Sequence, residues 1–75
     1  MGISNAQVLA MIYAGANITL DPRKFSALQR ESQVIAAGKY KVNVTYIRAN
    51  VLDHQERVFL SHIAPGLVHF DCIEA

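Results

Sequence analysis

The stretches Asn17-Ile18-Thr19-Leu20 and Asn43-Val44-Thr45-Tyr46 begin 26 residues apart, and His69-Phe70-Asp71-Cys72 follows after the same interval. Polar and apolar residues alternate in each stretch, which is typical of a strand that buries one face. A fixed period of this length indicates a repeat architecture, in which one small supersecondary unit is stacked. The sequence therefore predicts a single domain over residues 1–75 that is made of three similar units.

A helical segment precedes each predicted strand, and all three segments open with the same signal. The signal is a capping box, in which a Ser or Asp side chain accepts a hydrogen bond from the first turn and a Gln or Glu reaches back. The boxes are Ser4 with Gln7, Ser26 with Gln29, and Asp53 with Glu56. Three occurrences at corresponding places indicate helix starts much more strongly than one.

Helix ends are indicated by Gly15, Gly38 and Gly66. Glycine suits the position after a last helical turn because it adopts the left-handed conformation at little cost. Caps and glycines together predict helices near residues 4–14, 26–37 and 53–64. The alternating stretches predict strands near residues 17–21, 42–47 and 67–72.

Strands that are joined by helices through short turns pair in parallel, with a right-handed crossover. The predicted fold is therefore α/β: three tandem helix–strand repeats form a three-stranded parallel sheet in the order 1-2-3. Parallel sheets that are covered on both faces have strands that read as continuous apolar runs. Because these strands alternate instead, we expect helices on one face only, as in a short solenoid.

The other face of the sheet is expected to be polar. Its residues are Asn17, Thr19, Asn43, Thr45, His69 and Asp71. A constant register places them in two transverse rows: Asn17, Asn43 and His69 in one, and Thr19, Thr45 and Asp71 in the other. Such rows can satisfy their own hydrogen bonds across adjacent strands, and stacked repeats also use surfaces of this kind to recognise targets. The sequence leaves both interpretations open.

The sequence does not indicate a catalytic or metal-binding site. Zinc takes three or four protein ligands, but only His69 and Asp71 share a strand face. His54 and His62 fall on a helix that is expected on the other side of the sheet. Acid–base or nucleophilic catalysis needs two or three polar groups that converge in a pocket. We therefore expect a protein that is not an enzyme and that holds no metal and no cofactor.

The composition favours association with a protein. A chain of 75 residues is short for a self-sufficient core, yet it is 52% hydrophobic and only 17% charged. The predicted first helix is apolar nearly all round, so its outer face is expected either to wrap over the chain's own core or to contact another chain. The residues expected at this interface are Val8, Leu9, Met11, Ile12 and Tyr13.

A basic loop cluster provides a second hypothesis. Arg23, Lys24 and Arg48 follow the C-terminal ends of the first two predicted strands. They precede capped helix starts, where free N–H groups and the helix dipole attract anions. A phosphate ligand or a nucleic-acid backbone is the expected anion. The loop over residues 21–25 has no glycine to allow a close backbone approach, so it is not a P-loop.

The single cysteine, Cys72, excludes an intramolecular disulfide, and a cytoplasmic location is expected. No apolar run approaches the roughly 20 residues that cross a bilayer, so no membrane partner is expected. The leading hypothesis is a non-enzymatic protein-interaction or self-assembly module that acts as a homo-oligomer or docks onto another protein. Binding of nucleic acid or of a phosphate ligand through the basic loop cluster is the alternative, and it is not favoured.

Overall fold

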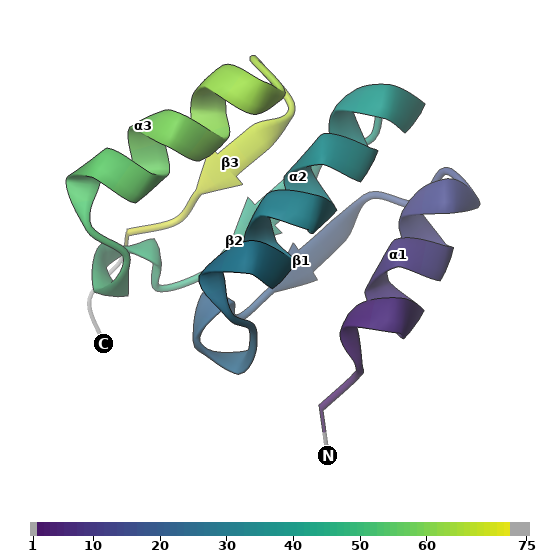
Figure 1. Ribbon diagram of the computed structural model, residues 1–75, viewed down its shortest axis with the longest axis horizontal. Coiled ribbons are helices and arrows are strands. Elements are labelled where there is room, and N and C mark those ends of the chain that lie inside the picture. The colour runs from purple at the N-terminus through teal and green to yellow at the C-terminus, as the bar shows by residue number, and fades with distance from the viewer. Residues whose placement is uncertain (1, 73–75) are drawn as a thin grey trace.

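The computed structural model describes residues 2–72 and places them in alternating helices and strands (Figure 1). In chain order the elements are α1 (Asn5–Tyr13), β1 (Ile18–Leu20), η1 (Pro22–Lys24), α2 (Ala27–Tyr40), β2 (Val44–Tyr46), η2 (Ala49–Val51), α3 (His54–Ile63) and β3 (Val68–Phe70). The two η elements are single 3₁₀ turns, which the sequence patterns did not indicate. Each of them leads from a strand toward the next helix.

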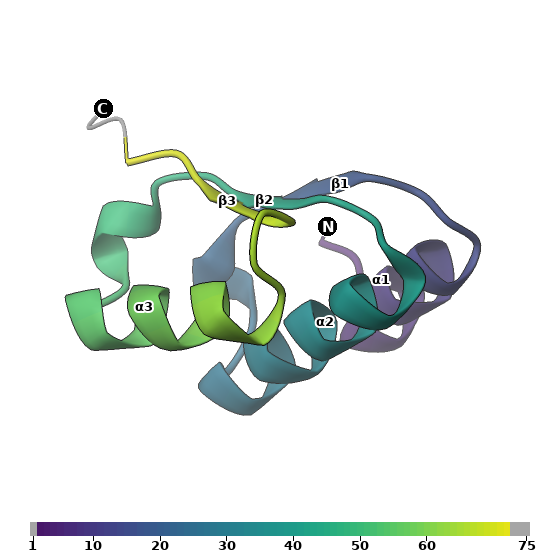
Figure 2. The same ribbon diagram turned by 90° about the horizontal axis from the view of Figure 1, so that it is seen from above.

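The strands form one open parallel sheet in the order β1-β2-β3. Figure 2 shows the helices together below the sheet, so the described chain has two layers and the opposite face of the sheet carries no helix. The predicted α/β fold, its strand order and its one-sided helix layer are therefore confirmed. Helices α1 and α3 lie further out than the strands beside them (Figure 1), because packed helices need about twice the spacing of paired strands.

The core lies between the two layers and is most complete under the central strand. Tyr46 of β2 is fully buried, whereas Val68 and Phe70 of β3 are half-buried. The Tyr46 hydroxyl donates to Gln33 Oε1 of α2 at 2.7 Å, and Gln33 Nε2 donates to Asn5 Oδ1 of α1 at 2.9 Å. Burial raises the pKa of the Tyr46 hydroxyl above its usual value, so the group remains a donor that joins β2, α2 and α1.

The pairing register changes from the first pair of strands to the second. Thr19 pairs with Thr45, 26 residues later, but Thr45 pairs with His69, 24 residues later. The third unit is shorter because α3 has 10 residues against 14 in α2, while each connection around α3 is one residue longer. The prediction of a constant register is therefore wrong for β3. Because the shift is an even number of residues, the same side chains still face outward.

The first two predicted capping boxes are complete. In α1, Ser4 Oγ accepts from the Gln7 N–H at 3.2 Å, and Gln7 Oε1 accepts from the Ser4 N–H at 2.9 Å. In α2, Ser26 and Gln29 make the same two bonds at the same lengths. Both helices therefore begin where the sequence predicts, because their free N–H groups are satisfied locally.

The third predicted box is only half formed. Asp53 Oδ1 accepts from the Glu56 N–H at 2.7 Å, which begins α3 at the predicted place. The Glu56 carboxylate does not return to the cap and instead pairs with Arg30 of α2, with Nε and Oε2 2.6 Å apart. An ion pair between two helices has therefore replaced the second bond of the box.

Helix α2 does not end at Gly38, as the sequence suggested. It continues to Tyr40, and Lys41 takes the left-handed position with a φ of 58°; Gly15 does follow α1 in that conformation, with a φ of 91°. Gly38 has a packing role instead, because a Cβ atom there would lie 3.3 Å from the Ala64 Cβ. Glycine at this place lets α2 pack closely against the C-terminal end of α3.

The observed strands are shorter than the predicted ones, and this changes the place of Cys72. Strand β3 ends at Phe70, and the next residue bonds to η2, since the Ala49 N–H donates to the Asp71 carbonyl at 2.9 Å. The Cys72 thiol is exposed and its Sγ accepts from Arg57 Nη1 at 3.4 Å. Alternation along the predicted strand over residues 67–72 would place Cys72 on the apolar face with Val68 and Phe70, and this prediction is wrong because the strand ends before it.

Candidate functional site

The open face of the sheet carries a row of hydrogen-bonded side chains. Asn17 Oδ1 accepts from the backbone N–H of Asn43 at 2.8 Å and from Asn43 Nδ2 at 3.3 Å. His69 Nε2 lies 2.8 Å from Asn43 Oδ1, and because an amide oxygen only accepts, this nitrogen carries the proton. The three side chains therefore satisfy one another across the sheet.

The second predicted row does not form. Thr19 and Thr45 are paired, but the shifted register sets His69 beside them, and Asp71 lies beyond the end of β3. The polar face is therefore built from the predicted residues in a different order. Within residues 2–72, no group of three His, Cys, Asp or Glu residues is placed to hold a metal ion.

The basic loop cluster lies at one end of the sheet, where η1 and η2 contact each other. Arg23 is engaged by Asp21, with Nε donating to Oδ1 at 3.1 Å and Nη2 donating to Oδ2 at 2.8 Å. The side-chain hydrogen bonds from Arg23 lower the pKa of Asp21 to about 2. An incoming anion would have to displace this carboxylate, which leaves Lys24 and Arg48 as the exposed cations. Anion binding here stays a prediction.

The outer surface of the helix layer exposes large apolar side chains. Among the most exposed are Leu28 at 78%, Tyr13 at 54%, Ile35 at 51% and Phe59 at 50%. Leu28 and Ile35 are seven residues apart on α2 and so lie on one stripe of the helix. We call the surface formed by Leu28, Ile35 and Phe59 the apolar helix face. Several large apolar side chains exposed on one layer of a small folded protein are typical of an interaction site.

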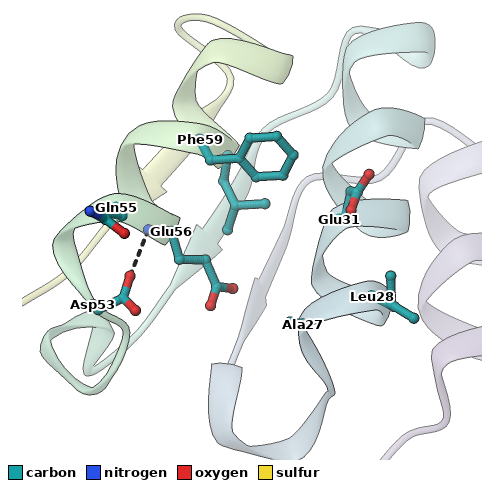
Figure 3. Close-up of a pocket in the computed structure, with 8 residues that line it drawn as sticks. Ala27, Leu28, Glu31, Asp53, Gln55, Glu56 and Phe59 are labelled. Atoms are coloured by element: carbon teal, nitrogen blue, oxygen red, sulfur yellow. Dashed lines mark hydrogen bonds between the residues drawn. The ribbon is translucent and has the colours of Figure 1, made fainter.

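Two separate hollows lie between α2 and α3 on the apolar helix face, one toward each end of the helices, and we refer to the two together as the groove. Its first half lies at the N-terminal ends of both helices and has a volume of about 330 Å³. Figure 3 shows Phe59 and Glu56 pointing from α3 toward α2 in this half. The charged residues that line it are all acidic, namely Glu31, Asp53 and Glu56. We call it the acidic half-groove.

The second half of the groove lies at the C-terminal ends of α2 and α3 and has a volume of about 240 Å³. Ile63 and Pro65 provide apolar lining, and the charged lining residues are Lys39 and Lys41. No acidic residue is among the described residues that line it. We call it the basic half-groove. The charge of the lining residues therefore changes from negative at one end of the groove to positive at the other.

Two charges on the groove are available to a partner. Glu31 and Lys39 form no ion pair with any other residue of the described chain. The Lys39 ammonium lies 5.6 Å from the centre of the Tyr40 ring. By contrast, Glu56 is held by Arg30, so Glu31 is the acid with the most freedom to bind.

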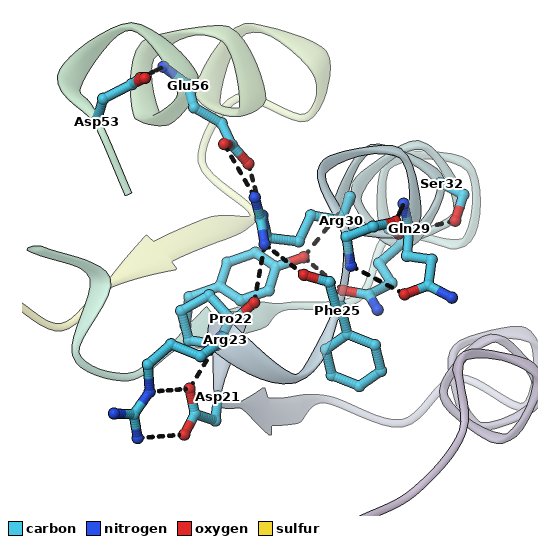
Figure 4. Close-up of polar contacts among 12 residues, drawn as sticks. Asp21, Pro22, Arg23, Phe25, Gln29, Arg30, Ser32, Asp53 and Glu56 are labelled. Atoms are coloured by element: carbon cyan, nitrogen blue, oxygen red, sulfur yellow. Dashed lines mark hydrogen bonds and ion pairs between the residues drawn. The ribbon is translucent and has the colours of Figure 1, made fainter. Parts of the chain in front are cut away.

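Arg30 sets the separation of α2 and α3 beside the acidic half-groove (Figure 4). Its guanidinium donates twice to Glu56, from Nε to Oε2 at 2.6 Å and from Nη2 to Oε1 at 3.0 Å. Nη1 donates to the carbonyl oxygens of Pro22 at 2.8 Å and of Phe25 at 2.5 Å. The side chains of Arg30 and Glu56 are only 12% and 21% exposed. A bidentate pair with this little exposure holds the helices in one arrangement.

The interface predicted on the first helix is divided between core and surface. Val8 and Ile12 are fully buried, because this side of α1 packs against the chain's own core, so they are not available to a partner. Leu9 is half-buried, and Met11 and Tyr13 are exposed. Leu9 and Tyr13 line a further groove between α1 and α2, where the Tyr13 ring lies 5.1 Å from the ring of Tyr40.

Sequence reasoning did not identify the apolar helix face. A signal was present on the second helix, where Leu28 and Ile35 share a stripe opposite Val34 and Ala37. The stripe with Val34 and Ala37 was recognisable as a core face. The stripe with Leu28 and Ile35 was not recognised as a second, exposed apolar stripe. Phe59 had no comparable signal, because its exposure depends on where α3 packs against α2.

No protein-family model, no curated protein and no solved structure matches this chain. None of the helices within residues 2–72 has the length and apolar character required to span a membrane. The function is therefore inferred from the two surfaces of the fold, namely the hydrogen-bonded face of the sheet and the apolar helix face.

Proposed function

We propose that this chain is a non-enzymatic protein-interaction module whose docking surface is the apolar helix face. The observation that carries the proposal is the exposure of Leu28, Ile35 and Phe59 along the groove between α2 and α3. Covering apolar surface stabilises a complex by about 25 cal/mol per Å² before the costs of association are subtracted. Because the exposed side chains are spread over two helices, a protein surface covers them better than a small molecule does.

The open face of the sheet is a poorer docking surface than the apolar helix face. There Asn17, Asn43 and His69 already bond to one another. A partner on that face would exchange existing hydrogen bonds for new ones, with little net gain. The helix face has apolar area to cover, so it is the better docking surface.

The proposal includes a reducing compartment such as the cytoplasm. Cys72 is an exposed free thiol. In an oxidising compartment such a thiol forms disulfides between chains. A docking module with this residue on its surface is better suited to reducing conditions.

The proposal is tested by photo-crosslinking in the native host. A photoreactive amino acid is placed at Leu28 or, as the matched control, at Thr19 on the open face of the sheet; both sites are exposed. We expect a discrete protein adduct from Leu28 and none from Thr19. Absence of an adduct from Leu28, or equal adducts from both positions, would contradict the proposal.

A second variant confirms that the adduct reflects docking. With the photoreactive residue at Phe59, the substitution Leu28→Asp is expected to reduce the adduct at least severalfold, because a carboxylate opposes burial of this surface. Leu28 is 78% exposed, so the same substitution leaves the melting temperature of the chain nearly unchanged. An adduct of undiminished yield would show that the photoreactive residue is not at a docking surface.

A further inference from the structure

We infer that the partner on the apolar helix face is a second copy of this chain, with the two α2 helices packed antiparallel across a two-fold axis at Ile35. The inference rests on the proposed function, because it names the occupant of the same surface. In a two-fold interface each contact occurs twice, with the residues exchanged between the copies. The surface must therefore be complementary to itself, and its charges, its groove and its shape each meet that condition.

The charges along α2 are self-complementary. Glu31 lies four residues before Ile35 and Lys39 lies four residues after it. At about 1.5 Å per residue, each charge is about 6 Å along the helix from the axis. Antiparallel packing sets Glu31 of one copy against Lys39 of the other, and does so twice. Neither side chain has an ion-pair partner within the described chain.

The groove between α2 and α3 repeats this pattern on a larger scale. Both helices run in the same direction (Figure 1), so their N-terminal ends form the acidic half-groove and their C-terminal ends form the basic half-groove. A two-fold axis across the helices places the acidic half of one copy against the basic half of the other. A parallel arrangement would set acid against acid and base against base, which disfavours it.

The shapes of the two halves also correspond. Leu28 projects from the N-terminal end of α2 and is the most exposed large apolar side chain. Antiparallel packing brings it to the basic half-groove of the other copy. There a hollow of about 240 Å³, with Ala64, Pro65 and Leu67 among its lining residues, can receive the Leu28 side chain. Ile35 meets the same residue of the other copy at the axis.

The size of the surface matches a dimer. The helix layer spans the two longer dimensions of the molecule, which measure 31 and 30 Å (Figure 1). A stable protein interface needs about 800 Å² from each partner. A layer of this extent is large enough to contain an interface of that size without any contribution from the sheet.

The test is light scattering on a size-exclusion column with the purified full chain over a range of concentrations. We expect a mass of twice 8.3 kDa at high micromolar concentration. Glu31→Lys sets two like charges against each other at both contacts, and Lys39→Glu does the same with the opposite sign. Each single variant is expected to weaken the dimer by about tenfold or more.

Mixing the two variants in equal amounts provides the decisive measurement. In the mixed dimer every pair between positions 31 and 39 again has opposite charges, so the original affinity is expected to return. Lys24→Glu is the matched control, because it makes the same change of charge in η1, outside the groove. All variants should keep the circular dichroism spectrum and, at concentrations low enough for the unchanged chain to be monomeric, its melting temperature, since positions 31 and 39 make no ion pair within the described chain.

The inference is overturned if the chain is monomeric at every concentration, if the single variants dimerise normally, or if mixing fails to restore the dimer. These results are distinct from failure of the proposed function. A monomeric chain that still gives an adduct with a different protein from Leu28 would leave the docking surface in place with another occupant. A monomeric chain that gives no adduct would remove both proposals.

Discussion

The first two helix–strand units and the third share their sequence signals but differ in their contacts. Gln7 and Gln29 return to their caps, whereas Glu56 at the corresponding place pairs with Arg30. The spacing of paired residues also changes, from 26 between β1 and β2 to 24 between β2 and β3. The difference teaches that a capping signal specifies where a helix begins, while a charged residue within it can be drawn into a tertiary contact.

The physical reason lies in the burial of Arg30. Its side chain is 12% exposed, and a guanidinium with so little water needs a carboxylate and further acceptors. A glutamine, being neutral, could not replace that carboxylate. Arg30 of the second unit therefore depends on the Glu56 carboxylate of the third unit. A glutamic acid at position 56 serves the contact between the two helices as well as the first turn of α3.

Removing Arg30 breaks the ion pair between α2 and α3 and is expected to have the largest effect on stability. Arg30→Ala is expected to lower the free energy of unfolding by about 3 kcal/mol, because Glu56 is then left partly buried without a partner. The carbonyl oxygens of Pro22 and Phe25 lose their donor as well. Chemical denaturation measures the change. Arg23→Ala is the matched control at an exposed ion pair and should change stability little; equal losses would contradict the comparison.

Glu56→Gln makes the third unit resemble the first two at this position. The expected loss is smaller, about 1 to 2 kcal/mol, because an amide oxygen still accepts one hydrogen bond from Arg30 but carries no charge. Denaturation of the single and double variants in a cycle with Arg30→Ala gives the coupling between the two residues. A coupling near zero would mean that the ion pair does not join the units.

Substitutions at the ends of α1 and α2 are expected to change the free energy of unfolding by an intermediate amount. Lys41 ends α2 with a φ of 58°, where α1 is followed by Gly15 with a φ of 91°. Lys41→Gly is expected to raise the free energy of unfolding by about 0.5 to 1 kcal/mol, and Gly15→Ala to lower it by about 1 kcal/mol. Thermal melting at low protein concentration measures both. The same sign for the two changes would show that backbone strain is not what separates these helix ends.

The smallest expected effect is a pH dependence of stability that distinguishes the two 3₁₀ turns. Asp21 begins η1 and its pKa is lowered to about 2 from 3.8 by the hydrogen bonds from Arg23, whereas η2 begins without a side-chain cap bond. The folded-state pKa is the lower one, so the stabilisation is present above about pH 4 and is lost as the pH falls through about 2. The Arg23 side chain is 50% exposed, and screening of its charge by water keeps the effect small.

The measurement compares the melting temperature of the unchanged chain with that of Asp21→Asn as the pH is lowered. The difference between them should be constant above about pH 4 and should shrink toward pH 2. A difference that stays constant throughout would mean that the carboxylate is not stabilised by Arg23 in the folded chain.

The fold could be predicted because its signals act over short distances. The alternation around Ile18, Val44 and Phe70 sets which side chains share a face, since successive side chains of a strand point in opposite directions. The bonds between Ser4 and Gln7 are local in the same sense. Short connections between helices and strands then restrict the crossovers to the right-handed form and the strands to the order 1-2-3.

The candidate site could not be predicted in the same way. Ile35 is exposed because α2 packs its other stripe, with Val34 and Ala37, against the core. Val8 and Ile12, which looked equally available in the sequence, are buried because α1 packs this side against the chain's own core. Periodicity shows that a helix has an apolar stripe, but not which of two stripes will be covered.

By itself, the sequence determined three helix–strand units, their starting points, the parallel order of the strands and the polar character of the open face of the sheet. Only the tertiary structure decided the register of β3, the partner of Glu56 and the exposure of Leu28, Ile35 and Phe59. Caps and alternation depend on neighbours a few residues away. Register, ion pairing and exposure depend instead on the lengths and packing of elements that lie far apart in the chain.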